Sequence, residues 1–454
     1  MTKGKKGFRV LLLSPPYPHL GGEELFGLSG REEWFPLGVF ALANAIRLER
    51  IADVRIYYHP DYTPATLEAV IRTYDPDIIG ITCFTNTRFA TFELAQIIKR
   101  IDKKIKVLLG GVHATFLDEQ IMKNYPFVDM IIRGYAERAF GDVIKAIINQ
   151  GNLGGIAGLT WRDEDKNVHR NCNRSLENDL TGELAGDIKS LFIDGLPTWK
   201  SMNMMEFALP VETARGCVYT CFFCSRMGPE NRTVVERQPD QALRYVHGLF
   251  KLFGRRQVYF SDTNFTINKK RVFEFCDLLR AQPFEIEWTC GTRVDLVDRE
   301  VLSAMRRAGC RKIYYGVDSL CKRILPSIGR HFTPEIAVKN LNLSVECDLE
   351  VQANVIIGFP GENAESVMET YSYRKQLHPM VQLTLRPLKI MPGGPLYHHA
   401  LKEGFQEDYW LEDHGCEFPS YTGAMSEKRI TEYCRIIKDP KNYKMRRDER
   451  LQGV

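Results

Sequence analysis

Three cysteines stand close together near the middle of the chain. In the segment "ARGCVYTCFFCSRMG", Cys217, Cys221 and Cys224 are separated by three and then two residues. Their thiolates can converge on one soft metal centre, for which zinc and iron–sulfur clusters are the usual choices. A structural zinc site commonly joins two distant cysteine pairs, and a ferredoxin supplies four cysteines. Three thiolates on a four-iron cluster leave one iron open, which is typical of a catalytic metal site.

The cysteines follow the first of six strand patterns, and helical patterns lie between these strands. The pattern predicts a partial parallel (β/α)6 TIM barrel over residues 206–400, with functional residues at the carboxyl ends of its strands. One helix is well marked, because Asp298 can cap its start and Gly309 can end it. The strand patterns cover residues 210–216, 257–262, 284–290, 312–318, 350–360 and 381–388.

A second α/β pattern precedes the barrel. Five short β-branched runs alternate with helical segments over residues 1–150, which predicts a doubly wound parallel sheet in a Rossmann-like domain. Apolar residues within 89–101 mark one face of a crossover helix. Right-handed crossovers place the loops after the strands along one edge, where such sheets bind ligands.

The remaining segments are predicted to connect or cover these two domains. Residues 151–205 are predicted as a linker in which 155–171 form a hairpin, and residues 401–454 as a small helical region with a solvated charged tail. The net charge of +4 gives no reason to expect a nucleic-acid partner. No stretch approaches the roughly 20 apolar residues of a membrane span. The scattered cysteines suit a reducing compartment, so a cytoplasmic protein is expected.

The cysteine spacing, with Phe223 before the last cysteine, resembles the radical S-adenosylmethionine superfamily. The resemblance covers residues 208–400. It implies that Cys217, Cys221 and Cys224 bind a 4Fe–4S cluster whose open iron chelates S-adenosylmethionine, which an electron then cleaves to a 5′-deoxyadenosyl radical.

Three later segments carry the same resemblance. "FSDTNFT", "YGVDS" and "VIIGFPGE" resemble segments that contact the methionine amino group, the carboxylate and ribose, and the adenine. For Asp262 and Asp318, an internal ion pair with Arg293 or Lys312 is the alternative to a cofactor contact. The resemblance implies cofactor binding by Phe223, Asp262, Thr263, Asp318, Ser319, Gly358 and Gly361.

The N-terminal domain resembles the cobalamin-binding domain of cobalamin-dependent radical S-adenosylmethionine enzymes. The segments "FPLGVFALANAIR", "PDIIGITCFTNT", "GGVHATF" and "RGYAE" carry this resemblance in their fixed order. His19 stands in "YPHLGG" where many corrinoid proteins have a cobalt-ligating histidine, but Tyr17 replaces the orienting Asp; Tyr135 and Ala136 add side chains that can narrow the pocket. The residues expected to bind cobalamin are Thr82, Thr85, Gly110, Gly111, His113, Gly134 and Glu137.

Together these features predict a cobalamin-dependent radical S-adenosylmethionine methyltransferase. By resemblance, it methylates an unactivated carbon or phosphorus of a small molecule or natural product and receives electrons from a flavodoxin or a ferredoxin-type protein. The alternatives are an oxidase or cyclase of the same architecture without methyl transfer, and a non-catalytic protein that binds zinc or a cluster. Methylthiolation of transfer RNA is disfavoured, because the N-terminal domain has no second cysteine trio. The sequence identifies neither the substrate nor a catalytic residue.

Overall fold

The computed structural model describes most of the chain and divides it into two compact units. The first unit combines Met1–Phe207 with the short segments Lys251–Phe253 and Trp410–Glu417, and the remaining residues form the second. His19 and the charged tail from residue 439 lie outside the described residues. The described residues are 7–15, 36–58, 63–175, 180, 183–186, 188–193, 208–225, 233–254, 256–414 and 418–438.

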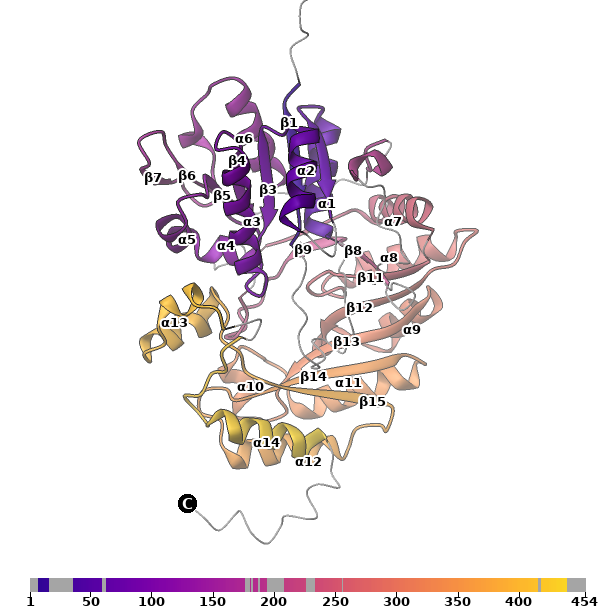
Figure 1. The fold of residues 1–454 in the computed structure, drawn as a ribbon. Coiled ribbons are helices and arrows are strands. Elements are labelled where there is room, and N and C mark those ends of the chain that lie inside the picture. The colour runs from indigo at the N-terminus through magenta and orange to yellow at the C-terminus, as the bar shows by residue number, and fades with distance from the viewer. Residues whose placement is uncertain are drawn as a thin grey trace, which may run out of the picture. The chain divides into compact units, whose positions relative to one another are not determined.

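The first unit contains a seven-stranded sheet with strand order β2-β1-β3-β4-β5-β6-β7 (Figure 1). Strands β1 to β5 are parallel, which confirms the predicted doubly wound sheet. Helix α1 packs against α6 and α2 against α3, so helices shield the apolar strands. The strands are β1 (Arg9–Leu13), β2 (Asp53–Tyr57), β3 (Ile78–Thr82), β4 (Lys106–Gly110) and β5 (Met130–Ile132). The helices are α1 (Leu37–Glu49), α2 (Pro64–Tyr74), α3 (Arg88–Ile101), α4 (Val112–Phe116), α5 (Asp118–Asn124) and α6 (Glu137–Ile148).

A hairpin extends this sheet beyond β5. Its strands are β6 (Leu159–Arg162) and β7 (Val168–Arg170), which pair antiparallel around a charged turn. Strand β6 also pairs antiparallel with β5. The hairpin expected inside a linker therefore belongs to the first sheet, because its backbone groups complete the edge that β5 would otherwise leave open.

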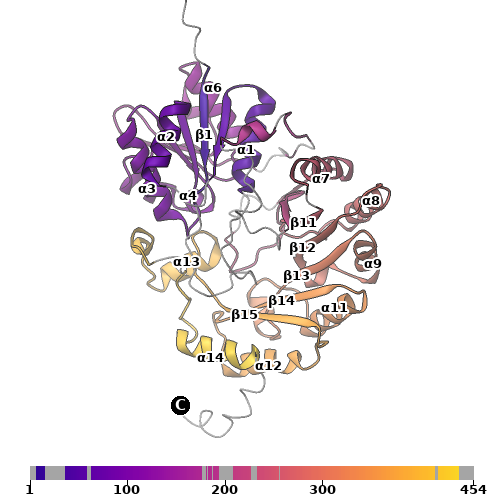
Figure 2. The same cartoon turned by 45° about the vertical axis from the view of Figure 1, so that its right-hand side comes forward.

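The second unit contains six parallel strands in their order along the chain, which confirms the partial barrel. Figure 2 shows α8, α9 and α11 on the same side of these strands. Asp298 caps α9 as predicted, since its side chain accepts a 2.9 Å hydrogen bond from the Val301 N–H. The strands are β8 (Leu209–Val211), β11 (Gln257–Phe260), β12 (Glu287–Arg293), β13 (Cys310–Asp318), β14 (Glu350–Ile357) and β15 (Val381–Pro387). The helices include α7 (Pro239–Phe253), α8 (Lys269–Arg280), α9 (Arg299–Arg307), α10 (Ile324–Ser327), α11 (Pro334–Glu346) and α12 (Ala364–Arg374).

The first barrel strand is shorter than the predicted segment 210–216. It ends at Val211, and β9 (Ala214–Gly216) instead pairs antiparallel with β10 (Val234–Glu236). The chain turns between them because the Asp262 carboxylate binds the backbone N–H groups of Thr213 and Ala214. The cysteines therefore follow this small two-stranded ladder and not the barrel strand itself.

Two further helices follow the barrel. Helix α13 (Gly394–Lys402) comes soon after β15, and α14 (Glu427–Lys438) packs against β15 and α12. Within the part of the chain that the structure describes, no helix is long and apolar enough to cross a membrane.

Candidate functional site

The cysteine loop, residues 217–224, is packed against two other segments of the second unit. The Phe222 N–H donates to the Ile328 carbonyl at 3.2 Å, and the Phe222 carbonyl accepts from the Leu396 N–H at 2.8 Å. Gly329 has φ +77°, and a Cβ there would lie 2.9 Å from the Thr220 carbonyl oxygen. Glycine is thus required where this neighbouring backbone approaches the loop.

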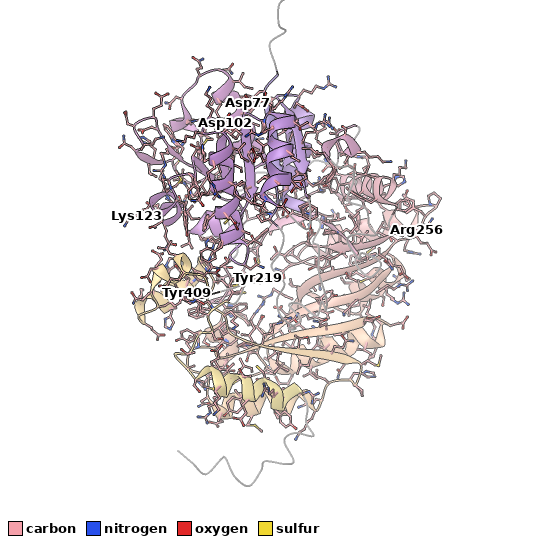
Figure 3. The ribbon with its side chains drawn as sticks, viewed as in Figure 1. Asp77, Asp102, Lys123, Tyr219, Arg256 and Tyr409 are labelled. Carbon is pink, nitrogen blue, oxygen red and sulfur yellow. The ribbon has the colours of Figure 1, made fainter. Side chains whose placement is uncertain are left out.

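Two side chains from elsewhere in the barrel contact the cysteine sulfurs. Asn264 Nδ2 lies 3.3 Å from Cys217 Sγ and donates to it. Arg293 Nη1 lies 4.0 Å from Cys221 Sγ, and its guanidinium carbon lies 3.7 Å from the ring centroid of Tyr219, labelled in Figure 3. Sulfur accepts hydrogen bonds weakly as a thiol and more strongly when it carries negative charge, so both donors suit a sulfur that is bound to a metal centre.

The three thiols share one short loop of the second unit, and all three are partly exposed. Among the described residues, no three His, Cys, Asp or Glu side chains converge closely enough to hold one ion. Burial raises the pKa of the Cys221 thiol, and nearby Arg330 opposes this rise; a bound metal ion also favours the thiolate.

A buried ion pair lies beside the cysteine loop. Asp318, at the end of β13, pairs with Arg330, and the two residues are 5% and 6% exposed. Neither Arg293 nor Lys312, the partners considered from the sequence, forms this pair, because Arg293 is bound to Asp295 and the Lys312 ammonium lies over the Tyr314 ring. Burial raises the pKa of the Asp318 carboxyl, and Arg330 opposes the rise.

Arg330 has hydrogen-bonding capacity left over. Its Nε and Nη1 groups are buried and have no hydrogen-bond partner among the described residues. The guanidinium carbon lies 6.0 Å from the ring centroid of Phe223, in the cysteine loop. Two buried nitrogens with unpartnered N–H groups fit a ligand that carries a carboxylate, as S-adenosylmethionine does.

Asp262 is occupied by contacts within the protein. Its carboxylate accepts hydrogen bonds from the Thr213 N–H at 2.6 Å, the Thr213 hydroxyl at 2.5 Å and the Ala214 N–H at 2.9 Å. Arg271 lies 4.0 Å from the same carboxylate. Asp262 thus fixes the turn ahead of the cysteine loop, while the neighbouring Thr263 is partly exposed. Their expected contact with a cofactor stays a prediction.

The loop after β14 contains a buried carboxyl group that the sequence did not single out. Gly358 and Gly361 have φ of +110° and +78°. Glu362 Oε2 accepts hydrogen bonds from the N–H groups of Gly358 at 2.5 Å and Phe359 at 3.2 Å, whereas Oε1 has no partner in the described part of the chain. Burial raises the pKa of Glu362 to about 7. The ring centroids of Phe223 and Phe359 are 5.5 Å apart, so this loop lies near the cysteines.

Ser319 follows Asp318 and is also buried. Its hydroxyl accepts a 3.1 Å hydrogen bond from the Cys321 N–H. The hydroxyl therefore helps to hold the loop after β13, and a ribose contact stays a prediction.

The predicted cobalamin residues of the first unit follow the ends of β3, β4 and β5. His113 is only 1% exposed, its Nδ1 lies 3.2 Å from the Thr85 hydroxyl, and burial lowers its pKa to about 3. His113 is thus neutral and internal, while Thr82 at the end of β3 is partly exposed. A Cβ on Gly111 would meet the Cys83 carbonyl oxygen at 2.7 Å, but one on Gly110 would meet nothing within 4 Å. A side chain could therefore be accommodated at Gly110, whereas glycine is required at Gly111 because φ is +95° and the neighbouring backbone is close.

The segment after β5 places the other two predicted residues. Gly134 has φ +81°, and its N–H donates to the Thr115 hydroxyl at 3.0 Å. Glu137 is the first residue of α6 and is partly exposed. Tyr135 and Ala136 stand between them and are also partly exposed.

The sequence did not indicate a structural role for Arg88. It is 1% exposed, and it donates to the carbonyls of Thr85 at 2.7 Å, Trp410 at 3.1 Å and Glu412 at 2.9 Å. The Trp410 and His113 ring centroids are 6.2 Å apart. A short segment from the C-terminal part of the chain therefore completes the first unit beside the predicted edge.

The first unit has a cavity of about 510 Å³ that lies away from the predicted cobalamin residues. Its lining includes Arg138, Asp142, Asn173 and Arg174, and no predicted site residue contributes to it. The cavity therefore bears on neither predicted cofactor site.

Comparison with known proteins identifies two domains. Residues 25–144 match the B12 binding domain, and residues 211–373 match the radical SAM superfamily. An uncharacterized methyltransferase of Pyrococcus horikoshii is 29% identical over 87% of this chain and 84% of its own length. An anaerobic magnesium-protoporphyrin IX monomethyl ester cyclase of Cereibacter sphaeroides is 28% identical over 80% of this chain, which spans only 59% of the cyclase.

Two solved structures share the fold over most of the chain. The radical S-adenosylmethionine methyltransferase TsrM of Kitasatospora setae has a TM-score of 0.71 at 16% identity and covers 87% of this chain and 76% of its own. The cobalamin-dependent radical enzyme OxsB, solved with aqua-cobalamin and S-adenosylmethionine, has a TM-score of 0.69 at 19% identity, over 97% of this chain and 62% of its own. The chain therefore carries a B12 binding domain followed by a domain that matches the radical SAM superfamily.

Proposed function

We propose that this protein is a cobalamin-dependent radical S-adenosylmethionine methyltransferase that acts on a small molecule. The observation that carries the proposal is the presence, in one chain, of a B12 binding domain and of a partial barrel with three partly exposed cysteines in one loop. The name of the relative from Pyrococcus horikoshii, an uncharacterized methyltransferase, supports methyl transfer as the reaction. In this proposal the methyl group goes to an unactivated carbon or phosphorus.

In this proposal the second unit binds the cluster and S-adenosylmethionine. Cys217, Cys221 and Cys224 hold a 4Fe–4S cluster, and the free N–H groups of Arg330 bind a carboxylate while Asp318 keeps the guanidinium in place. When bound, the cluster supplies the electron that cleaves S-adenosylmethionine, and cobalamin supplies the methyl group that is transferred. The protein orients these groups and excludes water from them.

The first unit binds cobalamin at the carboxyl edge of its sheet. The open space at Gly110 admits the flat macrocycle, and the partly exposed Thr82 offers a polar contact. His113 supports this site indirectly: its ring contacts the Thr85 hydroxyl, Arg88 binds the Thr85 carbonyl, and together they fix the loop after β3. A flavodoxin or a ferredoxin-type protein supplies the electrons, and the protein acts in the cytoplasm.

Anaerobic reconstitution of the full chain tests this function. We expect iron and labile sulfide in equal amounts, the visible absorbance of a bound corrinoid, and formation of both 5′-deoxyadenosine and S-adenosylhomocysteine from S-adenosylmethionine. Cys221→Ala removes the iron and sulfide, while the control Cys172→Ala, at an exposed thiol of the first unit, keeps them. Bound zinc without sulfide would instead favour a non-catalytic metal-binding protein, and the absence of corrinoid would overturn the cobalamin part of the proposal.

Oxidation or ring formation is the second candidate reaction. The 28% identity to the anaerobic cyclase over 80% of this chain favours it. Mass spectrometry of the product separates the two reactions, because methyl transfer adds one methylene unit and oxidation removes hydrogens. Turnover that yields 5′-deoxyadenosine without S-adenosylhomocysteine would replace the methyltransferase by this candidate.

A further inference from the structure

We propose that Asn264 and Arg293 set the reduction potential of the cluster by donating hydrogen bonds to the sulfurs of Cys217 and Cys221. This inference rests on the proposed function, in which the three cysteines hold a 4Fe–4S cluster. It assigns a role to two buried side chains on β12 and in the loop after β11.

The Asn264 amide is held in a fixed position. The residue is 8% exposed, and its Nδ2 lies 3.3 Å from Cys217 Sγ. The next residue, Phe265, is 1% exposed, and its N–H donates to the Gly291 carbonyl at 3.0 Å. The loop that carries the amide is thus anchored to β12, so the donor keeps its direction when the loop in front of it binds a cluster.

A second link joins the same loop to the strand that carries Arg293. The hydroxyls of Thr266 and Thr292 lie 2.7 Å apart and are both buried. Asn264 and Arg293 therefore belong to one cross-linked frame, and each approaches a different cysteine of the same loop.

The Arg293 guanidinium is oriented by Asp295. The arginine is 2% exposed, and the carboxylate accepts hydrogen bonds from Nε at 2.9 Å and Nη2 at 2.8 Å. The Tyr219 ring centroid lies 3.7 Å from the guanidinium carbon. This arrangement leaves Nη1 directed at Cys221 Sγ, at 4.0 Å. Asp295 offsets part of the positive charge, so the N–H group itself is the main contribution to the sulfur.

Donors of this kind change the energy of the reduced cluster more than that of the oxidised one. Reduction adds negative charge to the cluster and its sulfurs, and hydrogen bonds to the sulfurs stabilise that charge, which raises the potential. Burial of the Asn264 and Arg293 side chains reduces the solvent screening of these contacts, although the cysteines themselves are partly exposed. Removal of either donor is therefore expected to make the potential more negative.

The test is a redox titration of the reconstituted full chain, monitored by electron paramagnetic resonance. Asn264→Ala and Arg293→Met are each expected to lower the equilibrium constant for reduction by about tenfold, which is about 59 mV for a one-electron couple. The matched control is Asn342→Ala, which removes an amide that bonds to the Gln376 carbonyl and is expected to leave the potential unchanged. Iron and labile sulfide are measured for every variant.

The outcomes separate this inference from the proposed function. An unchanged potential in Asn264→Ala with full iron and sulfide overturns the inference and leaves the cluster assignment standing. A wild-type chain that takes up no labile sulfide overturns both. If Arg293→Met fails to fold because Asp295 loses its partner, Asn264→Ala alone decides, since it removes a single neutral amide.

Discussion

Glu362 makes the stability of the second unit depend on pH. Glu362 is 3% exposed, and within the described part of the chain its carboxyl group accepts hydrogen bonds from the backbone N–H groups of Gly358 and Phe359. Burial raises its pKa from the usual 4.5 to about 7. The informative substitution is Glu362→Gln, because glutamine keeps an oxygen for both N–H groups and cannot ionise.

The pKa values fix the sign and size of the effect. Between pH 4.5 and about 7 the folded protein keeps a proton on Glu362 that the unfolded chain releases, so stability falls as the pH rises through this window. At 1.36 kcal/mol per pKa unit, the total loss is about 3 kcal/mol, of which about 2.5 kcal/mol falls between about pH 5 and pH 8. The Glu362→Gln variant avoids this loss and should gain that much stability relative to wild type over the same interval.

Urea unfolding of the full chain, followed by circular dichroism at several pH values, measures the difference. The matched control is Glu365→Gln, at an exposed position in the first turn of α12, whose pH dependence should stay close to that of wild type. Stability curves of wild type and Glu362→Gln that run parallel from about pH 5 to pH 8 would refute the reasoning. The buried carboxyl would then be solvated or paired in solution.

Two further substitutions test how the chain supports the predicted cofactor sites. Gly329→Ala is expected to lower the free energy of unfolding by about 2–4 kcal/mol and to lower the iron content, because φ is +77° and the new Cβ would meet the Thr220 carbonyl. The control is Gly254→Ala, where φ is +66° and no atom lies near the new Cβ; thermal unfolding should show a loss of only about 1 kcal/mol. Arg88→Met leaves buried carbonyl groups without hydrogen-bond donors and should lower the free energy of unfolding by about 3 kcal/mol. Hydrogen exchange should then accelerate around Trp410, and unchanged exchange there would contradict the assigned role.

Local sequence signals predicted most of the architecture. The apolar runs of the first 150 residues became parallel strands, and the cap at Asp298 opened α9 as expected. These features are readable because hydrophobic period and cap chemistry act over a few residues. The sequence did not show where the first barrel strand ends, because the turn after Val211 is held by Asp262, which lies in the loop after β11.

The sequence predicted where the site lies better than it predicted which side chains contact one another there. The sequence placed the cysteines and the segments with Asp318 and Gly358 at the strand ends, and the structure brings Phe223 of the cysteine loop close to Phe359. It did not indicate that Arg330 would pair with Asp318. It predicted His113 as a cobalamin contact at the sheet edge, but not that the ring would be buried near Trp410; the contact itself stays a prediction.

The sequence by itself determined the order of the two α/β domains, the position of the three cysteines and the kind of metal centre they suit. These follow from hydrophobic periodicity and from the number and chemistry of the thiolates, which are properties of neighbouring residues. Only the tertiary structure decided which buried charges pair, which carboxyl group stays protonated near neutral pH, and which side chains reach the cysteine sulfurs. Such contacts join residues tens to hundreds of positions apart, and their energies depend on burial, which no local pattern specifies.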